Sequence, residues 1–107
     1  MARVLAVAND LLLGSRVEAM LGAAGHEVTL VPALPEAALD GFDLVVADLD
    51  SAGPDELAGL GVPVLGYYSH VEVETREAAL AAGIEVVVPR SRMSRELPSL
   101  VSELLSD

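Results

Sequence analysis

Two reactive residue types are missing from this sequence, which has no cysteine and no lysine. Without cysteine there is no disulfide framework, no thiol nucleophile and no cysteine-ligated metal, and nothing argues for an oxidising compartment. Without lysine, mechanisms that need an amine nucleophile or a phosphate-loop lysine are excluded. Long apolar runs are missing too, since the first run stops at Asn9 and Asp10, too early for a signal peptide or a membrane span. We therefore expect a cytoplasmic protein without membrane contact.

Positive charge is scarce. Six basic residues, all of them arginine, stand against seventeen acidic ones and give a formal net charge of -11. Such a surface repels nucleic-acid phosphates and anionic lipid headgroups, so we expect no nucleic-acid partner. A hydrophobic content of 52% with 21% charged residues excludes a disordered chain. The length suits one hydrophobic core, and we predict a single domain over residues 1–107.

Short β-branched runs alternate with helical patterns along the whole chain. The runs cover residues 4–8, 27–31, 43–47, 62–67 and 85–89. This alternation predicts repeated βαβ units and a parallel sheet. The runs are apolar without interruption, which is typical of strands that helices cover on both faces. The sequence therefore predicts a flavodoxin-like α/β fold, a three-layer sandwich with a five-stranded parallel sheet between two layers of helices.

Helical spacing is most regular at the two ends of the chain. Residues 11–24 place apolar side chains on one face, with Asp10 as the N-cap and Gly25 as the stop. A second apolar stripe runs over residues 97–105, and Pro98 is expected in the first turn of that helix, where its missing N–H does no harm. The stretches 35–40 and 54–60 offer only one or two turns each.

A fourth helix is predicted over residues 73–82. Ser69 and Glu72 form a capping box before it, and Gly83 supplies its C-terminal stop. A capping role is thus a sufficient explanation of Ser69, as it is of Asp10.

Functional side chains in a parallel sheet gather where the strands end. The residues at these positions are Asn9, Asp10, Asp48, Asp50, Tyr68, Ser69, His70 and Arg90. Asp48 has a purely structural alternative, since an acid at a strand end often caps the next turn or pairs with a cation such as Arg90. Asp50 fits the polar loop DSAGPDE, which collects turn residues.

Three segments resemble the receiver domains of two-component response regulators. FDLVVADLD is similar to the third receiver strand, AAGHEV to the segment after the first helix, and AALAAGIEVVVPR to the segment before the last helix. In order and spacing these segments cover nearly the whole chain. The resemblance implies that the phosphoacceptor aspartate falls on Asp48, and that the domain works in phosphorelay signal transduction.

The magnesium site of the family is altered in this sequence. The acidic pair that holds Mg²⁺ in receivers falls on Ala8 and Asn9, with Asp10 as the next residue. Asn9 offers a carbonyl oxygen but no charge, so Mg²⁺ is expected to depend on Asp10 with help from Asn9. In phosphoryl transfer such an ion neutralises charge that would repel the incoming phosphate.

The two remaining parts of the family's machinery are also altered. The switch hydroxyl falls on Tyr68, with Ser69 one place later, and the lysine position falls on Arg90. Arginine keeps the charge but presents a planar fork in place of a compact ammonium. The resemblance therefore implies an atypical receiver, or pseudo-receiver, in which Tyr68, Ser69 and Arg90 are the candidates for contact with a phosphoryl group.

Our leading functional prediction is a stand-alone signalling module, not an enzyme, that acts by protein contact. Its partner would be a signalling protein, either a histidine kinase or a downstream effector, and the face around the fourth and fifth strands and the last helix could also form a homodimer. Arg90, Arg92 and Arg95 hold half of the positive charge, which suits either a docking spot for an acidic or phosphorylated group or a solvated loop. Tyr67 marks either an interface or a buried core position.

The alternative from another class is a small-molecule or nucleotide-binding domain that uses the same crevice. Against it, the first strand is followed by VANDLLLGS, without a G-x-G-x-x-G motif or a phosphate loop. Met1 and the helical end favour a complete chain over a fragment of a larger protein. The richness in Ala, Gly, Leu and Val without Lys is typical of a GC-rich bacterial genome.

Overall fold

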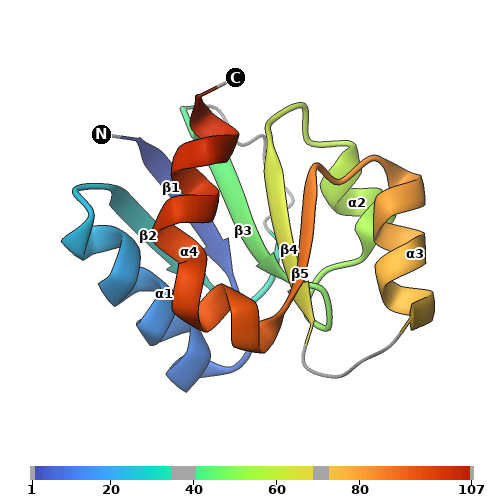
Figure 1. The fold of residues 1–107 in the computed structure, drawn as a ribbon, viewed down its shortest axis with the longest axis horizontal. Coiled ribbons are helices and arrows are strands. Elements are labelled where there is room, and N and C mark those ends of the chain that lie inside the picture. Colours follow the sequence, from blue (N-terminus) through green and yellow to red (C-terminus); the bar gives the residue numbers. More distant parts are fainter. Residues whose placement is uncertain (1, 35–40, 69–72, 107) are drawn as a thin grey trace.

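The computed structural model describes residues 2–34, 41–68 and 73–106. Strands and helices alternate along these residues, as Figure 1 shows, except between the second and third strands, where residues 35–40 lie outside the described ranges. The strands are β1 (Arg3–Val7), β2 (Glu27–Val31), β3 (Leu44–Asp48), β4 (Val64–Tyr68) and β5 (Val86–Pro89). The helices are α1 (Leu11–Ala23), α2 (Pro54–Ala58), α3 (Val73–Ala82) and α4 (Arg90–Leu105).

All neighbouring strands of the sheet are parallel, in the order β2-β1-β3-β4-β5. Figure 1 shows α1 and α4 on one side of this sheet and α2 and α3 on the other. The predicted three-layer, five-stranded flavodoxin-like fold is thereby confirmed. No helix in the described part of the chain is long and apolar enough to span a membrane.

The strands contribute alternate side chains to two separate cores. The core beneath α1 and α4 takes Leu65 and Tyr67 from β4, whereas the core beneath α2 and α3 takes Val64 and Tyr68. This is the period-two alternation of an extended strand whose two faces are both covered. The two consecutive tyrosines therefore lie on opposite faces of the sheet.

The predicted signals at the ends of α1 and α3 agree with the structure. Asp10 is the N-cap of α1, where its Oδ1 accepts hydrogen bonds from the backbone N–H of Leu12 and Leu13 at 3.0 and 3.3 Å. Gly25 and Gly83 follow α1 and α3 with φ of 92° and 100°, a conformation that glycine adopts without steric penalty. The helical stretch 35–40 and the capping box of Ser69 and Glu72 lie outside the described residues.

The expected start of the last helix was wrong. Helix α4 begins at Arg90, directly after β5, so Pro98 lies inside the helix and not in its first turn. The cause is the buried Met93, which extends the apolar stripe of Leu97, Leu100 and Val101 upstream by one turn. A proline inside a helix removes one backbone hydrogen bond and bends the axis, and Figure 1 shows α4 changing direction along its length.

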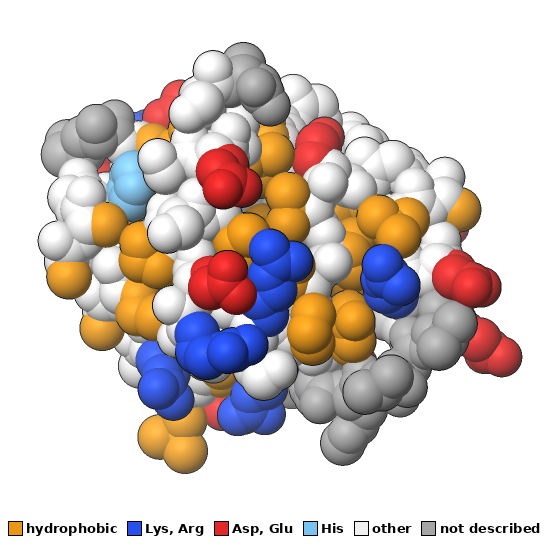
Figure 2. All heavy atoms as spheres, viewed as in Figure 1, with side chains coloured by type: hydrophobic (Ala, Val, Ile, Leu, Met, Phe, Trp, Pro, Cys, Tyr) orange, Lys and Arg blue, Asp and Glu red, His pale blue; other side chains and the backbone are white. Residues whose placement is uncertain are grey.

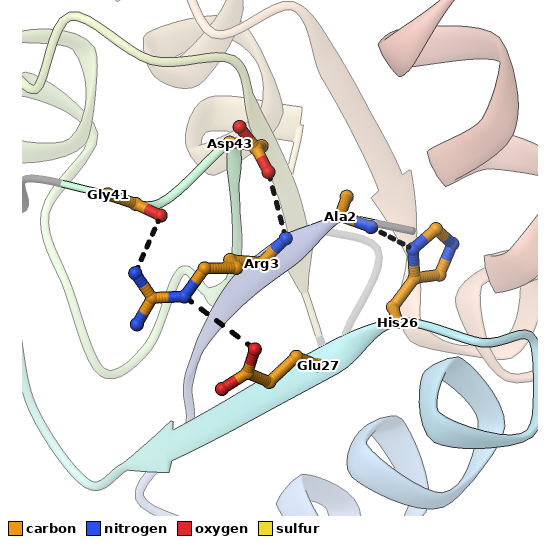
Figure 3. A network of polar contacts seen from close by, with 6 residues as sticks. All are labelled: Ala2, Arg3, His26, Glu27, Gly41 and Asp43. Atoms are coloured by element: carbon orange, nitrogen blue, oxygen red, sulfur yellow. Dashed lines mark hydrogen bonds and ion pairs between the residues drawn. The ribbon is translucent and has the colours of Figure 1, made fainter.

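The amino ends of the first three strands are joined by a network of polar contacts, shown in Figure 3. Its members are Ala2, Arg3, His26, Glu27, Gly41 and Asp43. The backbone N–H of Arg3 donates to Asp43 Oδ2 at 2.9 Å, and the N–H of Ala2 donates to His26 Nδ1 at 3.1 Å. His26 is thus half-buried, and its Nδ1 accepts a hydrogen bond. Because these strands are parallel, this network lies at the end of the sheet opposite to their carboxyl ends.

Candidate functional site

Asp48 is the last residue of β3 and the only charged side chain buried among the residues that the structure describes. Only 5% of it is exposed. The remainder of β3 is apolar and buried on both sides, which draws its polar end into the protein. Oδ1 of Asp48 accepts a hydrogen bond from the backbone N–H of Asp50 at 2.9 Å. A carboxyl group at this depth is an exceptional feature that calls for a functional explanation.

The surroundings of Asp48 raise the pKa of its carboxyl group. Burial is the largest cause, and the negative charges of Asp50 and Asp10 act in the same direction. The hydrogen bond from the Asp50 backbone and the positive charge of Arg90 oppose the rise. The structure therefore brings three of the predicted residues, Asp48, Asp10 and Arg90, within electrostatic reach of one another.

The loop after β3 closes over this end of the sheet. The N–H groups of Ser51 and Ala52 both donate to the Asp48 carbonyl oxygen, at 2.9 and 3.2 Å, which forms a tight turn. Ser51 Oγ in turn accepts a hydrogen bond from the backbone N–H of Asn9 at 2.9 Å. Ser51 thus ties the β3 loop to the residue that follows β1. Sequence reasoning missed this role, because a serine in a turn-rich segment carries no distinguishing signal.

The predicted magnesium ligands are exposed at the rim of the site. Asp10 uses its Oδ1 to cap α1, and Asn9 contributes its backbone N–H to Ser51. Among the described residues, no three acidic or histidine side chains gather as a ready cage for a metal. Mg²⁺ commonly keeps several waters and binds through one or two carboxylates. The residues present therefore fit a largely hydrated ion near Asp10 and Asp48, because the negative charge of Asp10 acts on Asp48 here.

Arg90 stands at the start of α4, immediately after β5. It is exposed, and its charge acts on both Asp48 and Tyr67. Within the described ranges Arg90 makes no direct ion pair with Asp48, so its positive charge acts on the carboxylate without direct contact.

Of the two predicted hydroxyl candidates, the structure describes only Tyr68 and does not bring it beside Asp48. Tyr68 is buried in the core beneath α2 and α3, and Ser69 lies outside the described residues. Asp48 pairs in register with Tyr67, so its side chain projects toward the α1 and α4 face. The structure therefore puts Tyr67, and not Tyr68, on the side of the sheet where Asp48 lies.

Tyr67 is a site residue whose placement the sequence left open. Its side chain is 1% exposed, which confirms the core position. Burial is the largest cause of a strong rise in the pKa of its phenol, and the charge of Asp48 adds to that rise. Arg90 lowers this pKa and Asp10 raises it. The phenol therefore stays protonated at neutral pH and shares the electrostatic environment of Asp48.

Comparison with known proteins rests on structure alone. No protein-family model matches the sequence, and no curated protein matches it closely enough to count as a relative. The fold is similar to that of a response regulator receiver domain protein from Clostridium thermocellum, with a TM-score of 0.86 and 15% identity over 99% of this chain and 95% of that one.

Two other solved structures agree. The BeF3-activated N-terminal receiver domain of RstA from Klebsiella pneumoniae has a TM-score of 0.83 at 19% identity, over 98% of this chain and 99% of that one. A response regulator protein from Burkholderia multivorans has a TM-score of 0.77 at 24% identity, over 100% and 97% of the two chains. The chain is thus a flavodoxin-like α/β protein, and its fold is that of response regulator receiver domains.

Proposed function

We propose that this chain is an atypical receiver domain, not an enzyme with a separate substrate, that signals by contact with another protein. Asp48 is the residue whose phosphorylation would switch the domain between its two signalling states. The observation that carries the proposal is the burial of this one acid at the carboxyl edge of the sheet, with Arg90 and Asp10 acting on it from the ends of two other strands. A carboxylate in such a place is a nucleophile with a cation beside the path of an incoming phosphate.

Each residue of the site has a defined part in this proposal. The carboxylate of Asp48 attacks the phosphorus atom of a phosphodonor, and Arg90 neutralises the negative charge of the phosphoryl group that arrives. Asp10, with Asn9 beside it, is the residue that would hold Mg²⁺, which when bound supplies further charge neutralisation at the phosphate. Ser51 fixes the loop that carries Asp50 over the site.

The contact surface for a partner is proposed on the basic side of the molecule. Arg90, Arg92 and Arg95 lie exposed on the first turns of α4, and Figure 2 shows basic side chains gathered over this part of α4 and the start of α1. Leu11 and Leu12 at the start of α1 are 71% and 85% exposed. On a chain of net charge -11, such a local excess of arginine suits a signalling protein with an acidic surface.

For the alternative of a small-molecule or nucleotide site, two surface hollows lie in the described part of the chain. One, of about 450 Å³, lies between His26, Pro98 and Leu105, and another, of about 340 Å³, lies between Pro63, Glu85 and Leu104. Both are bounded by residues at the amino ends of strands and the carboxyl end of α4. They are therefore at the opposite end of the sheet from Asp48.

The proposal is tested with acetyl phosphate and Mg²⁺, read by the intact mass of the protein. In the expected reaction a carboxylate oxygen of Asp48 forms a bond to phosphorus, the bond from phosphorus to the acetyl oxygen breaks, and acetate leaves. A Mg²⁺-dependent phosphate adduct on the wild-type chain that is absent from Asp48→Asn supports the proposal. A folded wild-type protein without any adduct contradicts the role of Asp48 and leaves a module that signals by constitutive contact.

A further inference from the structure

The hydroxyl group of Tyr67 is buried without a hydrogen-bond partner among the described residues. The side chain is 1% exposed, so water does not reach its tip freely. Buried hydroxyl groups are nearly always hydrogen-bonded, because they lose their bonds to water on folding. An unused donor at this depth therefore requires a specific explanation.

The nearest explanation lies on the neighbouring strand. Tyr67 and Asp48 are direct register partners across β4 and β3, which are parallel strands spaced about 4.8 Å apart. Their side chains project to the same side of the sheet, and the charge of Asp48 acts on the phenol. Asp48 itself uses only Oδ1, toward Asp50, among the contacts formed within the described ranges. The phenol O–H, which has no partner among the described residues, thus lies on the same side of the sheet as this buried carboxylate.

We propose that Tyr67 is a positioning residue for Asp48, and that its phenolic O–H donates to the ionised carboxyl group and, once Asp48 is phosphorylated, to the phosphoryl group. The second half of this inference rests on the function proposed above, and the first half does not. A neutral phenol suits the task, since it donates without adding a charge to a site that already holds Arg90.

The same side chain connects Asp48 to helix α4. Tyr67 belongs to one core cluster with Met93 and Leu97, both fully buried residues of α4. A displacement of its hydroxyl oxygen moves the ring within that packing, because the oxygen is bonded directly to the rigid ring. Tyr68 packs in the opposite core with α2 and α3 residues and has no such connection. It is therefore the matched control for every test of Tyr67.

The first test is a double-mutant cycle of Tyr67→Phe and Asp48→Ala, measured by urea unfolding at pH 8. Alanine is used because asparagine would keep an acceptor oxygen. If the hydroxyl donates to Asp48, Tyr67→Phe lowers stability, and the cycle shows a coupling of about fivefold or more in the folding equilibrium constant. The control cycle of Tyr68→Phe with Asp48→Ala shows additive effects. If Tyr67→Phe is neutral or stabilising and adds to Asp48→Ala, the hydroxyl is simply unpaired and the inference is overturned.

The second test concerns the phosphorylated state. With acetyl phosphate and Mg²⁺, we expect Tyr67→Phe to change the lifetime of the Asp48 adduct severalfold, whereas Tyr68→Phe keeps the wild-type lifetime. Equal lifetimes in all three proteins overturn the second half of the inference. If the wild-type chain takes up no phosphoryl group, the function proposed above fails, and the double-mutant cycle still decides whether Tyr67 positions Asp48.

Discussion

Asp48 and Tyr67 lie opposite each other on β3 and β4, a buried acid beside a buried phenol on one side of the sheet. The charge of Asp48 raises the pKa of the Tyr67 phenol, because neither side chain is screened by bulk water. The pair is bounded by the ends of β1 and β5, which carry Asp10 and Arg90. The stability of this domain should therefore depend on pH in ways that single substitutions can reveal.

The first prediction concerns the pKa of Asp48, which is raised above its ordinary value of 3.8, chiefly by burial. Because the folded state holds this proton more tightly than the unfolded chain, the free energy of unfolding falls as pH rises from about 3.8 through the folded-state pKa. Asp48→Asn cannot ionise and keeps an acceptor for the Asp50 N–H. We expect it to be more stable than wild type at pH 7, with the difference shrinking toward pH 3, measured by urea unfolding.

The control for this experiment is Glu18→Gln on the exposed side of α1. A surface acid is screened by water, so its neutralisation should leave the pH profile close to that of the wild type. An Asp48→Asn protein that is less stable than wild type at pH 7 would contradict the prediction. It would mean that ionised Asp48 gains more from Arg90 and Asp50 than it loses by burial.

The second prediction follows from the raised pKa of Tyr67, whose largest cause is burial. The folded protein should keep this phenol protonated above pH 10.0, the ordinary value. The unfolded chain ionises there, so the stability that Tyr67 contributes is lost as pH rises beyond that value. Phenolate absorbance during alkaline titration should show a late step that coincides with unfolding. That step should be missing from Tyr67→Phe and present in Tyr68→Phe.

The third prediction separates two roles of Asp10, as the N-cap of α1 and as a proposed ligand of Mg²⁺. Asp10→Ala removes the N-cap of α1, which receives two backbone N–H groups, and should lower stability by about 0.5–2 kcal/mol. Asp10→Ser keeps the cap and removes the charge, so its stability should stay close to that of the wild type. Thermal unfolding of both variants measures the difference.

The same pair of variants tests the metal. If Asp10 holds Mg²⁺, both variants should need more Mg²⁺ than the wild type for the same yield of phosphate adduct on Asp48. A wild-type Mg²⁺ dependence in Asp10→Ser would restrict Asp10 to its capping role. The control is Glu18→Gln, which removes an exposed acid of α1 outside the site and should keep the wild-type Mg²⁺ dependence.

The fold was largely predictable because its signals are local. The apolar strand runs, Asp10 and the glycines after α1 and α3 act within a few residues of chain, and each agrees with the structure. The start of α4 was missed because its first turns are rich in arginine and offer only Met93 to the core. Proline is also far more common in a first turn than inside a helix, which made the wrong start attractive.

The sequence was sufficient to predict which residues follow the strand ends, but not how their side chains are placed in the site. Parallel strands bring their carboxyl ends together, so the topology alone predicts that Asp48, Asp10 and Arg90 meet. Which of two adjacent tyrosines joins them depends on the pairing register, and a shift of one residue reverses every side chain. The predicted fourth strand gave no such register, and only the pairing of Tyr67 with Asp48 decides the question. The chemical roles of Asn9, Asp10 and Arg90 stay predictions.

The last prediction concerns Gly66, one residue before Tyr67 in β4. A Cβ atom at this position would lie 2.9 Å from Cδ2 and 3.2 Å from Cγ of Leu49, the buried residue that follows Asp48. Gly66→Ala should therefore push Leu49 and its loop away from the sheet and lower stability by about 1–3 kcal/mol. Gly22→Ala is the control of opposite sign, because its Cβ meets nothing within 4 Å, and removing a helical glycine should add about 0.5–1 kcal/mol.

Since Leu49 is joined to Asp48, Gly66→Ala should also slow adduct formation with acetyl phosphate, which Gly22→Ala should leave unchanged. A Gly66→Ala protein with wild-type stability would show that Leu49 can turn aside, and that the loop over Asp48 is packed less tightly than its contacts indicate.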